Sequence, residues 1–251
     1  MGTTQTIQRH NDEIHANALM WERKPALRLC YRDFHSAIAA CLAPSHGGGC
    51  LEIGSGIGKI KEVLPDCITS DLFGNPWIDR EENAYHLDFK DGSLDNIIMF
   101  DVFHHLEYPG SALAESWRVL RPGGRLTIFE PDVGWLGRMV YGVFHPEPLG
   151  LDQPIDWTGP PHFDSPVLRY YAAQGNASRV FVKHEIPDAL DGWELVARIR
   201  KSALTYVASG GFSGRQLYPT VAYPVLRWIE RLLDRFPAVF ATRLLVSLQK
   251  Q

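Results

Sequence analysis

Residues 51–59 read LEIGSGIGK, and this segment decides how the rest of the chain is interpreted. A short apolar run at residues 50–53 precedes three glycines at alternate positions, and a segment that favours a short helix follows to about residue 64. Glycines let a backbone turn sharply and approach a ligand, while the first amides of a helix offer hydrogen-bond donors. The segment therefore predicts a strand, a ligand-binding loop and a helix in that order.

Two common classes of glycine-rich loop do not fit this segment. A P-loop needs GxxxxGK followed by Ser or Thr, but its first glycine would be Ile53 and its hydroxyl residue would be Ile60. A dinucleotide-binding loop needs GxGxxG, and here Lys59 stands where the third glycine should be, since Gly58 comes one residue early. A P-loop is therefore excluded, and a nicotinamide oxidoreductase is kept as a weaker alternative.

Downstream of the loop, strand and helix patterns alternate. Residues 94–100 (LDNIIMF) form a near-continuous apolar run, which is typical of a central strand buried on both faces. Shorter strands are expected at residues 67–70, 84–89 and 125–129, with a helix at 112–120 and a turn at 121–124. Upstream, apolar residues at three- and four-residue steps predict a helix at 25–42, and residues 1–20 are expected to be a mobile arm or a short helix. The alternation predicts an α/β fold with a doubly wound sheet.

After Glu130 the regular pattern stops and resumes near Trp193. Residues 131–188 are rich in Pro, Gly, His and aromatics, which indicates an inserted cap, and beyond it we expect a strand at 194–206, a turn at 209–214, a helix at 224–236 and a last strand at 241–249. The chain is interpreted as one domain, 1–251. It comprises an N-terminal arm and helix (1–45), a ligand-binding core (46–130), a cap (131–190) and the C-terminal part of the sheet (191–251).

Composition limits the partners. The net charge of −4 gives no excess of positive charge for binding phosphates, so a nucleic-acid partner is not expected. The four cysteines form no CxxC pair and are expected to be buried free thiols in a reducing compartment. The N-terminus is polar and no long stretch is free of charge, so a cytoplasmic location is expected. For the amphipathic segment 224–236 docking onto the sheet is favoured, with membrane-surface contact and a homodimer interface as alternatives.

The GxGxG form preceded by Glu52 resembles motif I of class I S-adenosylmethionine (SAM) dependent methyltransferases. The resemblance continues in order over residues 51–132, and VLRPGGRLTIFEPD (119–132) is similar to the type 11 branch of that superfamily. It implies a Rossmann-like sheet of about seven strands, mostly parallel with the last strand antiparallel, and S-adenosyl-L-methionine as the cofactor.

The same resemblance implies roles for individual residues. Asp71, at the end of the second strand, would accept hydrogen bonds from both ribose hydroxyls, and Leu72 would pack on the adenine. Asp88 and Phe89 would border the adenine, with Asn83 or Ala84 as alternatives because the segment is short. Glu52 would contact the methionine amine or hold backbone amides. The expected cofactor-binding residues are Glu52, Gly54, Ser55, Gly56, Gly58, Asp71, Leu72, Asp88, Phe89 and Asp101.

Methyl transfer to a hydroxyl needs a group that removes a proton, and this group is expected near the carboxyl ends of the strands. The candidates are His104 and His105, which follow Asp101 directly, and Glu130 after the fifth strand; Asp132 is a further candidate for contact with the substrate. In the cap, a base or a metal ligand could come from His145, Glu147, His162 or Asp164, but their spacing is not tight enough to predict a metal site.

The favoured activity is O-methylation of a small-molecule substrate. GGFSGRQLYP (210–219) resembles a subgroup found with polysaccharide and glycolipid biosynthesis, which points to a sugar or a glycolipid precursor. The alternatives are N- or C-methylation of a metabolite and a catalytically silent SAM-binding module.

Overall fold

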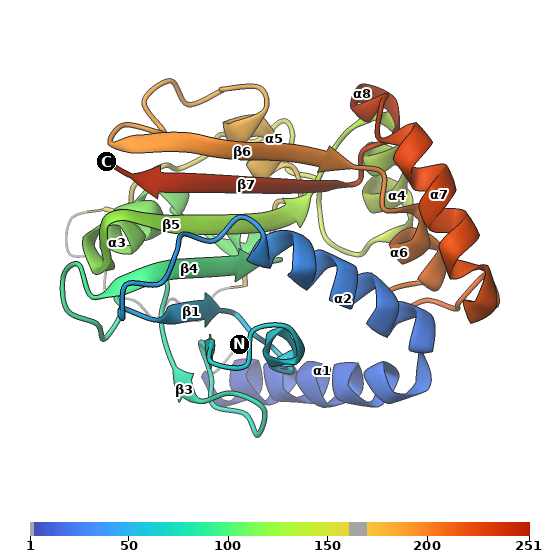
Figure 1. The fold of residues 1–251 in the computed structure, drawn as a ribbon, viewed down its shortest axis with the longest axis horizontal. Coiled ribbons are helices and arrows are strands. Elements are labelled where there is room, and N and C mark those ends of the chain that lie inside the picture. The colour runs from blue at the N-terminus through green and yellow to red at the C-terminus, as the bar shows by residue number, and fades with distance from the viewer. Residues whose placement is uncertain (1–2, 161–169) are drawn as a thin grey trace.

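The computed structural model describes residues 3–160 and 170–251, so the cap residues His162 and Asp164 lie outside the described part. A seven-stranded sheet with the order β3-β2-β1-β4-β5-β7-β6 runs through the molecule (Figure 1). Its strands are β1 (Cys50–Ile53), β2 (Ile68–Asp71), β3 (Arg80–Glu81), β4 (Leu94–Phe100), β5 (Leu120–Pro131), β6 (Trp193–Lys201) and β7 (Arg243–Lys250).

The strand directions confirm the predicted sheet. β1 pairs in parallel with β2 and β4, and β2–β3 and β4–β5 are also parallel. Only β7 runs the other way, antiparallel to both β5 and β6. The carboxyl ends of β1, β2, β4 and β5 therefore meet at one edge, which is where ligands bind in open sheets of this kind.

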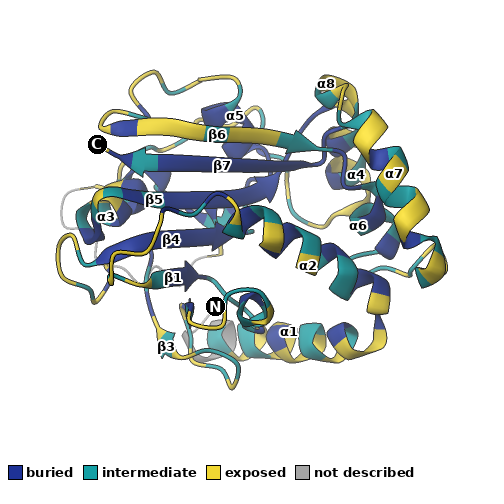
Figure 2. Ribbon diagram, in the orientation of Figure 1, coloured by how far each residue is buried: buried dark blue, intermediate teal, exposed yellow. Residues whose placement is uncertain are grey.

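Helices cover both faces of the sheet. α2 (Pro25–Ala39), α6 (Leu204–Ser209) and α7 (Tyr223–Leu233) contribute to one apolar cluster, which includes Ile98 and Phe100. α3 (Pro109–Val119) and α5 (Asn176–Phe181) contribute to the opposite cluster with Ile97 and Met99. Because β4 alternates between the two clusters, all its residues are buried, as the apolar run predicts; Figure 2 shows this buried centre.

The N-terminal segment differs from the prediction. Instead of a mobile arm or a short helix, α1 (Thr3–Arg23) is a helix of 21 residues. Its Ile14 and Trp21 are buried in a small cluster with Ile57 of the glycine loop. Few apolar positions mark this helix in the sequence, and its partner lies more than thirty residues away along the chain. The helix is stabilised by a tertiary contact that local pattern does not reveal.

Two predicted elements after the glycine loop are wrong. The helix to residue 64 is only one 3₁₀ turn, η1 (Lys59–Glu62), because Pro65 disfavours helical conformation just before it. The third strand is not at 84–89 but at β3, because Asn83 begins a turn in which its Oδ1 accepts the Tyr85 amide (3.0 Å).

Two strand boundaries also move. Residues 121–124 are not a separate turn but belong to β5, which accommodates them through an irregularity in its pairing with β4. β6 stops at Lys201 rather than near 206, since Ala203 has a left-handed φ of 44° and α6 follows it. The last helix and strand agree with the prediction within a few residues.

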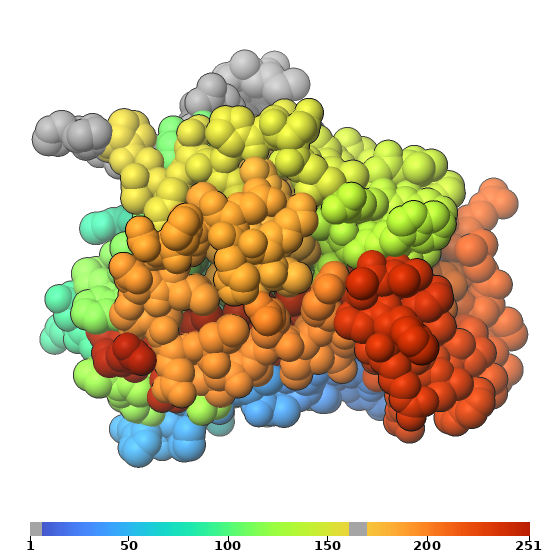
Figure 3. All heavy atoms as spheres, turned by 90° about the horizontal axis from the view of Figure 1, so that it is seen from above, coloured from blue at the N-terminus to red at the C-terminus, as the bar shows by residue number. Residues whose placement is uncertain are grey.

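After Pro131, where β5 ends, the described residues of the segment to 190 form no strand. These residues hold α4 (Trp135–Phe144) and α5, and Figure 3 shows the described part of the segment, lime to orange, on the side of the molecule opposite the blue N-terminal helices. The short helices η2 (Phe103–His105), η3 (Thr220–Ala222) and α8 (Pro237–Phe240) complete the fold. Among the helices of the described ranges, none combines the length and apolar character that crossing a bilayer requires. All four cysteines are free thiols, with Cys50 half-buried and the others buried.

Candidate active site

The glycine loop has a backbone shape that side chains disfavour. Gly54, Gly56 and Gly58 all have positive φ, at 69°, 53° and 62°. A Cβ on Gly54 would lie 2.4 Å from Cγ2 of Val102, and one on Gly58 would lie 2.3 Å from the backbone oxygen of Trp77. The glycines are thus required by backbone conformation and by close packing.

Asp71 connects the loop to the end of β2. Its Oδ2 accepts the Gly56 amide (3.1 Å) and its Oδ1 accepts the Leu72 amide (2.7 Å). The Ser55 amide donates to the carbonyl of Ser70 (2.7 Å), which fixes the loop to β2. An ionised carboxylate has about four lone-pair sites, so Asp71 retains acceptor capacity beside the loop.

α1 brings a residue to Asp71 that sequence reasoning missed. Nε2 of His10 lies 3.5 Å from Oδ1 of Asp71, and the ring packs edge-on against Phe73. The contact with the Asp71 carboxylate raises the pKa of His10 against the opposing effect of burial. No motif marks His10, because its position depends on how α1 folds over the loop.

Glu52 has a buried carboxylate group, and one of its oxygens lacks a hydrogen-bond partner among the described residues. Its residue is 3% exposed, and its Oε2 has no hydrogen-bond partner among the described residues. Burial raises the pKa of Glu52 to about 7. An oxygen of this kind at the carboxyl end of β1 fits a cationic group, such as the ammonium of the methionine part of SAM.

The pKa of Glu52 predicts how stability changes with pH. The folded-state pKa of about 7 lies above the ordinary 4.5, so folding opposes ionisation and stability is lost as the pH rises from about 4.5 through 7. Glu52→Gln removes this loss. Between pH 5 and pH 8 the unfolding free energy of the variant should gain roughly 2 to 3 kcal/mol relative to wild type, measured by urea unfolding without cofactor. A difference that does not change with pH would contradict the prediction.

Of the three residues expected near the adenine, only Leu72 has a side chain that is available to contact a ring. Leu72 follows Asp71 directly and is 38% exposed, so it is available to pack on a ring. The Asp88 side chain is 96% exposed and pairs with Arg80 (3.3 Å), whose guanidinium lies over the Phe89 ring. Asp88 thus points to solvent, while Phe89 is occupied by Arg80. Their roles at the adenine stay predictions.

Beyond β4, the chain turns through Asp101 and η2. Asp101 has a left-handed φ of 56° and its carboxylate pairs with the guanidinium of Arg243 on β7. That arginine is almost fully buried and lies over the ring of Tyr206, 4.5 Å from its centroid. Sequence reasoning missed Arg243, because only the pairing of β7 with β5 brings it to the end of β4.

Glu130 is fully buried, and its carboxylate oxygens accept hydrogen bonds from η2 and from the residue just before it. Its Oε1 accepts the amides of Val102 (2.7 Å) and Phe103 (2.6 Å), and its Oε2 accepts Nδ1 of His104 (2.6 Å). These bonds hold the turn that carries both histidines. The geometry therefore favours a positioning role for Glu130 over the role of proton acceptor. Asp132 is likewise engaged, in a bidentate pair with Arg200.

The two histidines meet a carboxylate from the cap. Nε2 of His104 lies 3.5 Å from Oε2 of Glu147, and Nε2 of His105 lies 3.7 Å from Oε1. Tyr170 and Gln174 also donate hydrogen bonds to Glu147. The sequence named Glu147 as one of four polar cap residues but could not place it on the histidine pair.

The two histidines differ in charge. Burial disfavours charged His104, but the nearby carboxylates of Glu130 and Glu147 outweigh it and raise the pKa of His104 to about 10. Burial and the neighbouring His104 lower the pKa of His105 to about 4. His105 Nδ1 lies 3.0 Å from the carbonyl of Tyr171, so it carries the proton and leaves Nε2 as a free lone pair.

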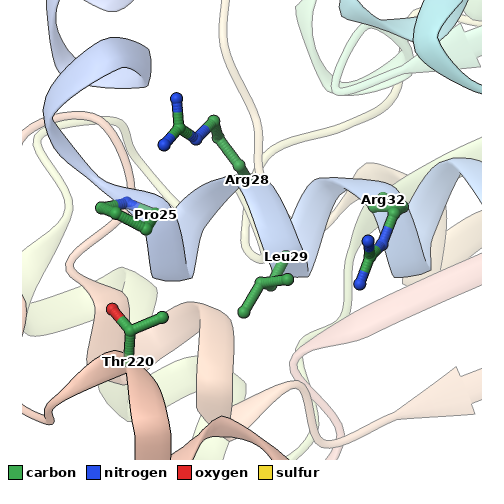
Figure 4. A pocket seen from close by; sticks show the side chains of 5 residues that line it. All are labelled: Pro25, Arg28, Leu29, Arg32 and Thr220. Carbon is green, nitrogen blue, oxygen red and sulfur yellow. The ribbon is translucent and has the colours of Figure 1, made fainter.

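A separate surface pocket of about 340 Å³ lies between α2 and η3. Figure 4 shows its lining residues Pro25, Arg28, Leu29, Arg32 and Thr220. None of the predicted site residues lines it, so it is distinct from the edge described above.

Comparison with known proteins shows which family the glycine loop and the strands after it resemble. Residues 51–128 match the family model of the type 11 methyltransferase domain. An uncharacterized 37.1 kDa protein in transposon TN4556 of Streptomyces fradiae is 47% identical over 58 residues, which are 23% of this chain and only 17% of that protein.

Solved structures share the fold. A SAM-dependent methyltransferase from Thermotoga maritima, described as a possible histamine N-methyltransferase, aligns over the full length of both chains with a TM-score of 0.56 and 15% identity. Geranyl diphosphate C-methyltransferase from Streptomyces coelicolor aligns with 88% of this chain and 76% of its own, with a TM-score of 0.52 and 10% identity. Residues 51–128 thus match a methyltransferase domain, and the chain shares the fold of SAM-dependent methyltransferases.

Proposed function

We propose that this chain, which carries a methyltransferase domain over residues 51–128, transfers the methyl group of SAM to a hydroxyl of a small molecule. The observation that carries the proposal is the cluster of His104, His105 and Glu147 just beyond the carboxyl end of β4. It offers proton-accepting atoms next to Asp101, where the resemblance expects the methionine end of the cofactor.

The chemistry explains why such a cluster matters. The acceptor oxygen forms a bond to the methyl carbon while the carbon–sulfur bond breaks, and S-adenosylhomocysteine leaves with the electron pair. An alcohol is a weak nucleophile, so its proton must leave as the bond forms. His105 supplies an uncharged Nε2 with a free lone pair, and Glu147 supplies carboxylate oxygens. Removal of the proton is thus the part of the reaction assigned to the protein.

The remaining residues bind and orient. Asp71 and the glycine loop hold the ribose end, and the orphaned Glu52 oxygen takes the methionine ammonium. Glu130 fixes η2 and so orients His104. α1 reaches this edge of the sheet through His10, and the cap reaches it through Glu147. For the acceptor, a sugar or a glycolipid precursor is the class to test first.

The proposal is tested by following the methyl group. Protein, SAM with a labelled methyl and a metabolite extract enriched in sugars and glycolipids are incubated, and the labelled product is identified by mass spectrometry. We expect label on an oxygen and at least a ~100-fold slower transfer in His105→Gln, the loss typical of removing an acid–base group. His46→Gln, which changes an exposed histidine on another loop, is the matched control.

Other outcomes would contradict the proposal in identifiable ways. Label on nitrogen or carbon would replace O-methylation by the corresponding alternative. Persistent absence of labelled product, although SAM binds, would indicate a silent SAM-binding module.

A further inference from the structure

Three potential ligand atoms converge at the carboxyl end of β4. One ring nitrogen of His104, one of His105 and a carboxylate oxygen of Glu147 all lie within 4.8 Å of one another, and Nε2 of each ring faces Glu147. The side chains are 4%, 36% and 14% exposed, so the group is largely buried but open to the acceptor side through His105. Two imidazoles and one carboxylate are a ligand set that borderline divalent transition metals prefer.

The other ring nitrogen of each histidine is already engaged. Nδ1 of His104 lies 2.6 Å from the Glu130 carboxylate, and Nδ1 of His105 lies 3.0 Å from the Tyr171 carbonyl. Both partners accept a proton, so both rings are oriented with Nε2 toward Glu147. Histidines that bind a metal almost always donate their second ring N–H to a carboxylate or a backbone carbonyl. The cluster has this arrangement for both histidines.

The separations suit an ion. Two ligand atoms at about 2.1 Å from one ion, at 90–110° to each other, lie roughly 3.0 to 3.4 Å apart. The observed 3.5 Å and 3.7 Å between the ring nitrogens and Glu147 require only a small contraction. They are also too long for good direct hydrogen bonds. The lone pair of His105 thus faces the Glu147 carboxylate, an unfavourable pairing that a cation between them would relieve, and binding of the ion would displace the proton from Nε2 of His104.

A second possible group, Asp101, His104 and Glu130, does not fit. It would use Nδ1 of His104, which lies only 2.6 Å from Glu130 Oε2. That distance is a direct hydrogen bond and leaves no room for an ion with normal bond lengths to both atoms. The first group is the only one of the two that is open for a ligand.

We propose that His104, His105 and Glu147 bind one divalent transition-metal ion of the zinc type, with a coordination position left open for the acceptor oxygen. Such an ion lowers the pKa of an oxygen acid that it binds and stabilises the resulting anion. Its role in catalysis rests on the proposed O-methylation, whereas binding of the ion does not. With the ion present, the acceptor proton passes to water, and His105 serves as a ligand instead of a base.

The test is a titration of the chelator-treated full chain with Zn²⁺ by calorimetry, and with Co²⁺ by visible absorption. Wild type should bind about one ion, with the absorption of a cobalt site that has nitrogen and oxygen ligands. His105→Gln and Glu147→Gln should each weaken binding by more than ~100-fold, beyond the roughly 10- to 100-fold loss typical of an outer-shell partner. His46→Gln should leave binding unchanged, and circular dichroism shows whether each variant is folded. No stoichiometric binding, or full affinity in both folded variants, would overturn the inference.

Activity separates this inference from the proposed function. Transfer to a hydroxyl that continues unchanged in excess chelator would overturn the ion's catalytic role and leave O-methylation standing. Zn²⁺ bound at the site, with label found on nitrogen or carbon, would confirm the metal site and overturn O-methylation.

Discussion

Glu130→Ala is expected to lower the free energy of unfolding by about 3 to 5 kcal/mol, the cost typical of breaking a buried charged pair from one side. The substitution leaves the amides of Val102 and Phe103 without an acceptor and deprives His104 of its partner carboxylate. None of these groups can turn to solvent, since the site of Glu130 is fully buried. Methyl transfer should fall below detection, because η2 carries both histidines.

Urea unfolding and single-turnover transfer measure the two effects. Glu130→Gln is the informative companion, because its carbonyl oxygen can still accept the amides of η2 while its NH₂ group would face Nδ1 of His104. We expect it to be more stable than Glu130→Ala and still defective in transfer. Glu194→Ala, on the exposed part of β6, controls for loss of a glutamate. A loss of less than about 1 kcal/mol in Glu130→Ala would refute the positioning role.

The position of Glu130 could be predicted from the sequence, but its hydrogen-bond partners could not. Its place at this edge of the sheet could be predicted, because the carboxyl ends of parallel strands meet there, although Glu130 lies within the last residues of β5 and not after the strand. That it faces η2 depends on the alignment of Phe100 of β4 with Phe129 of β5. This register is a property of the sheet that no local pattern contains, so a role as base was the natural interpretation of an acid at this point.

The cofactor side was more predictable than the acceptor side for the same reason. The glycine loop and Asp71 are each fixed by a strand end within a short stretch of chain, and the structure joins them through the Gly56 amide. By contrast, His10 reaches Asp71 from α1, and Glu147 reaches the histidines from the cap. Such contacts depend on helices and loops that pack from far away in the sequence.

The pair of histidines lies between these cases. Their position after β4 could be predicted from FDVFHHL, since they adjoin the end of a buried strand. Their difference could not, because it arises from partners: Glu130 raises the pKa of His104, while burial and His104 lower that of His105. Two adjacent histidines thus have different pKa values because their neighbours in the fold differ.

Asp71→Ala is expected to weaken SAM binding by about 2 to 3 kcal/mol, or roughly 30- to 150-fold, because under the proposed binding mode the ribose hydroxyls would lose a charged acceptor. The Gly56 amide also loses its partner, so the glycine loop should become less well ordered. Calorimetry with SAM and with S-adenosylhomocysteine measures the effect. Because both share the ribose, the two dissociation constants should rise by similar factors.

Asp66→Asn is the control for loss of an acidic charge, since this exposed residue precedes the start of β2, at the opposite end of the strand from Asp71. It should leave SAM affinity unchanged. Asp71→Asn separates the loss of the backbone hydrogen bond from the loss of the charge, because its single carbonyl oxygen still accepts one backbone amide while the negative charge is removed. We expect its loss of SAM affinity to lie between those of Asp71→Ala and Asp66→Asn. Binding of NAD in place of SAM by wild type, with SAM affinity unaffected in Asp71→Ala, would instead support the nicotinamide alternative that the glycine spacing disfavours.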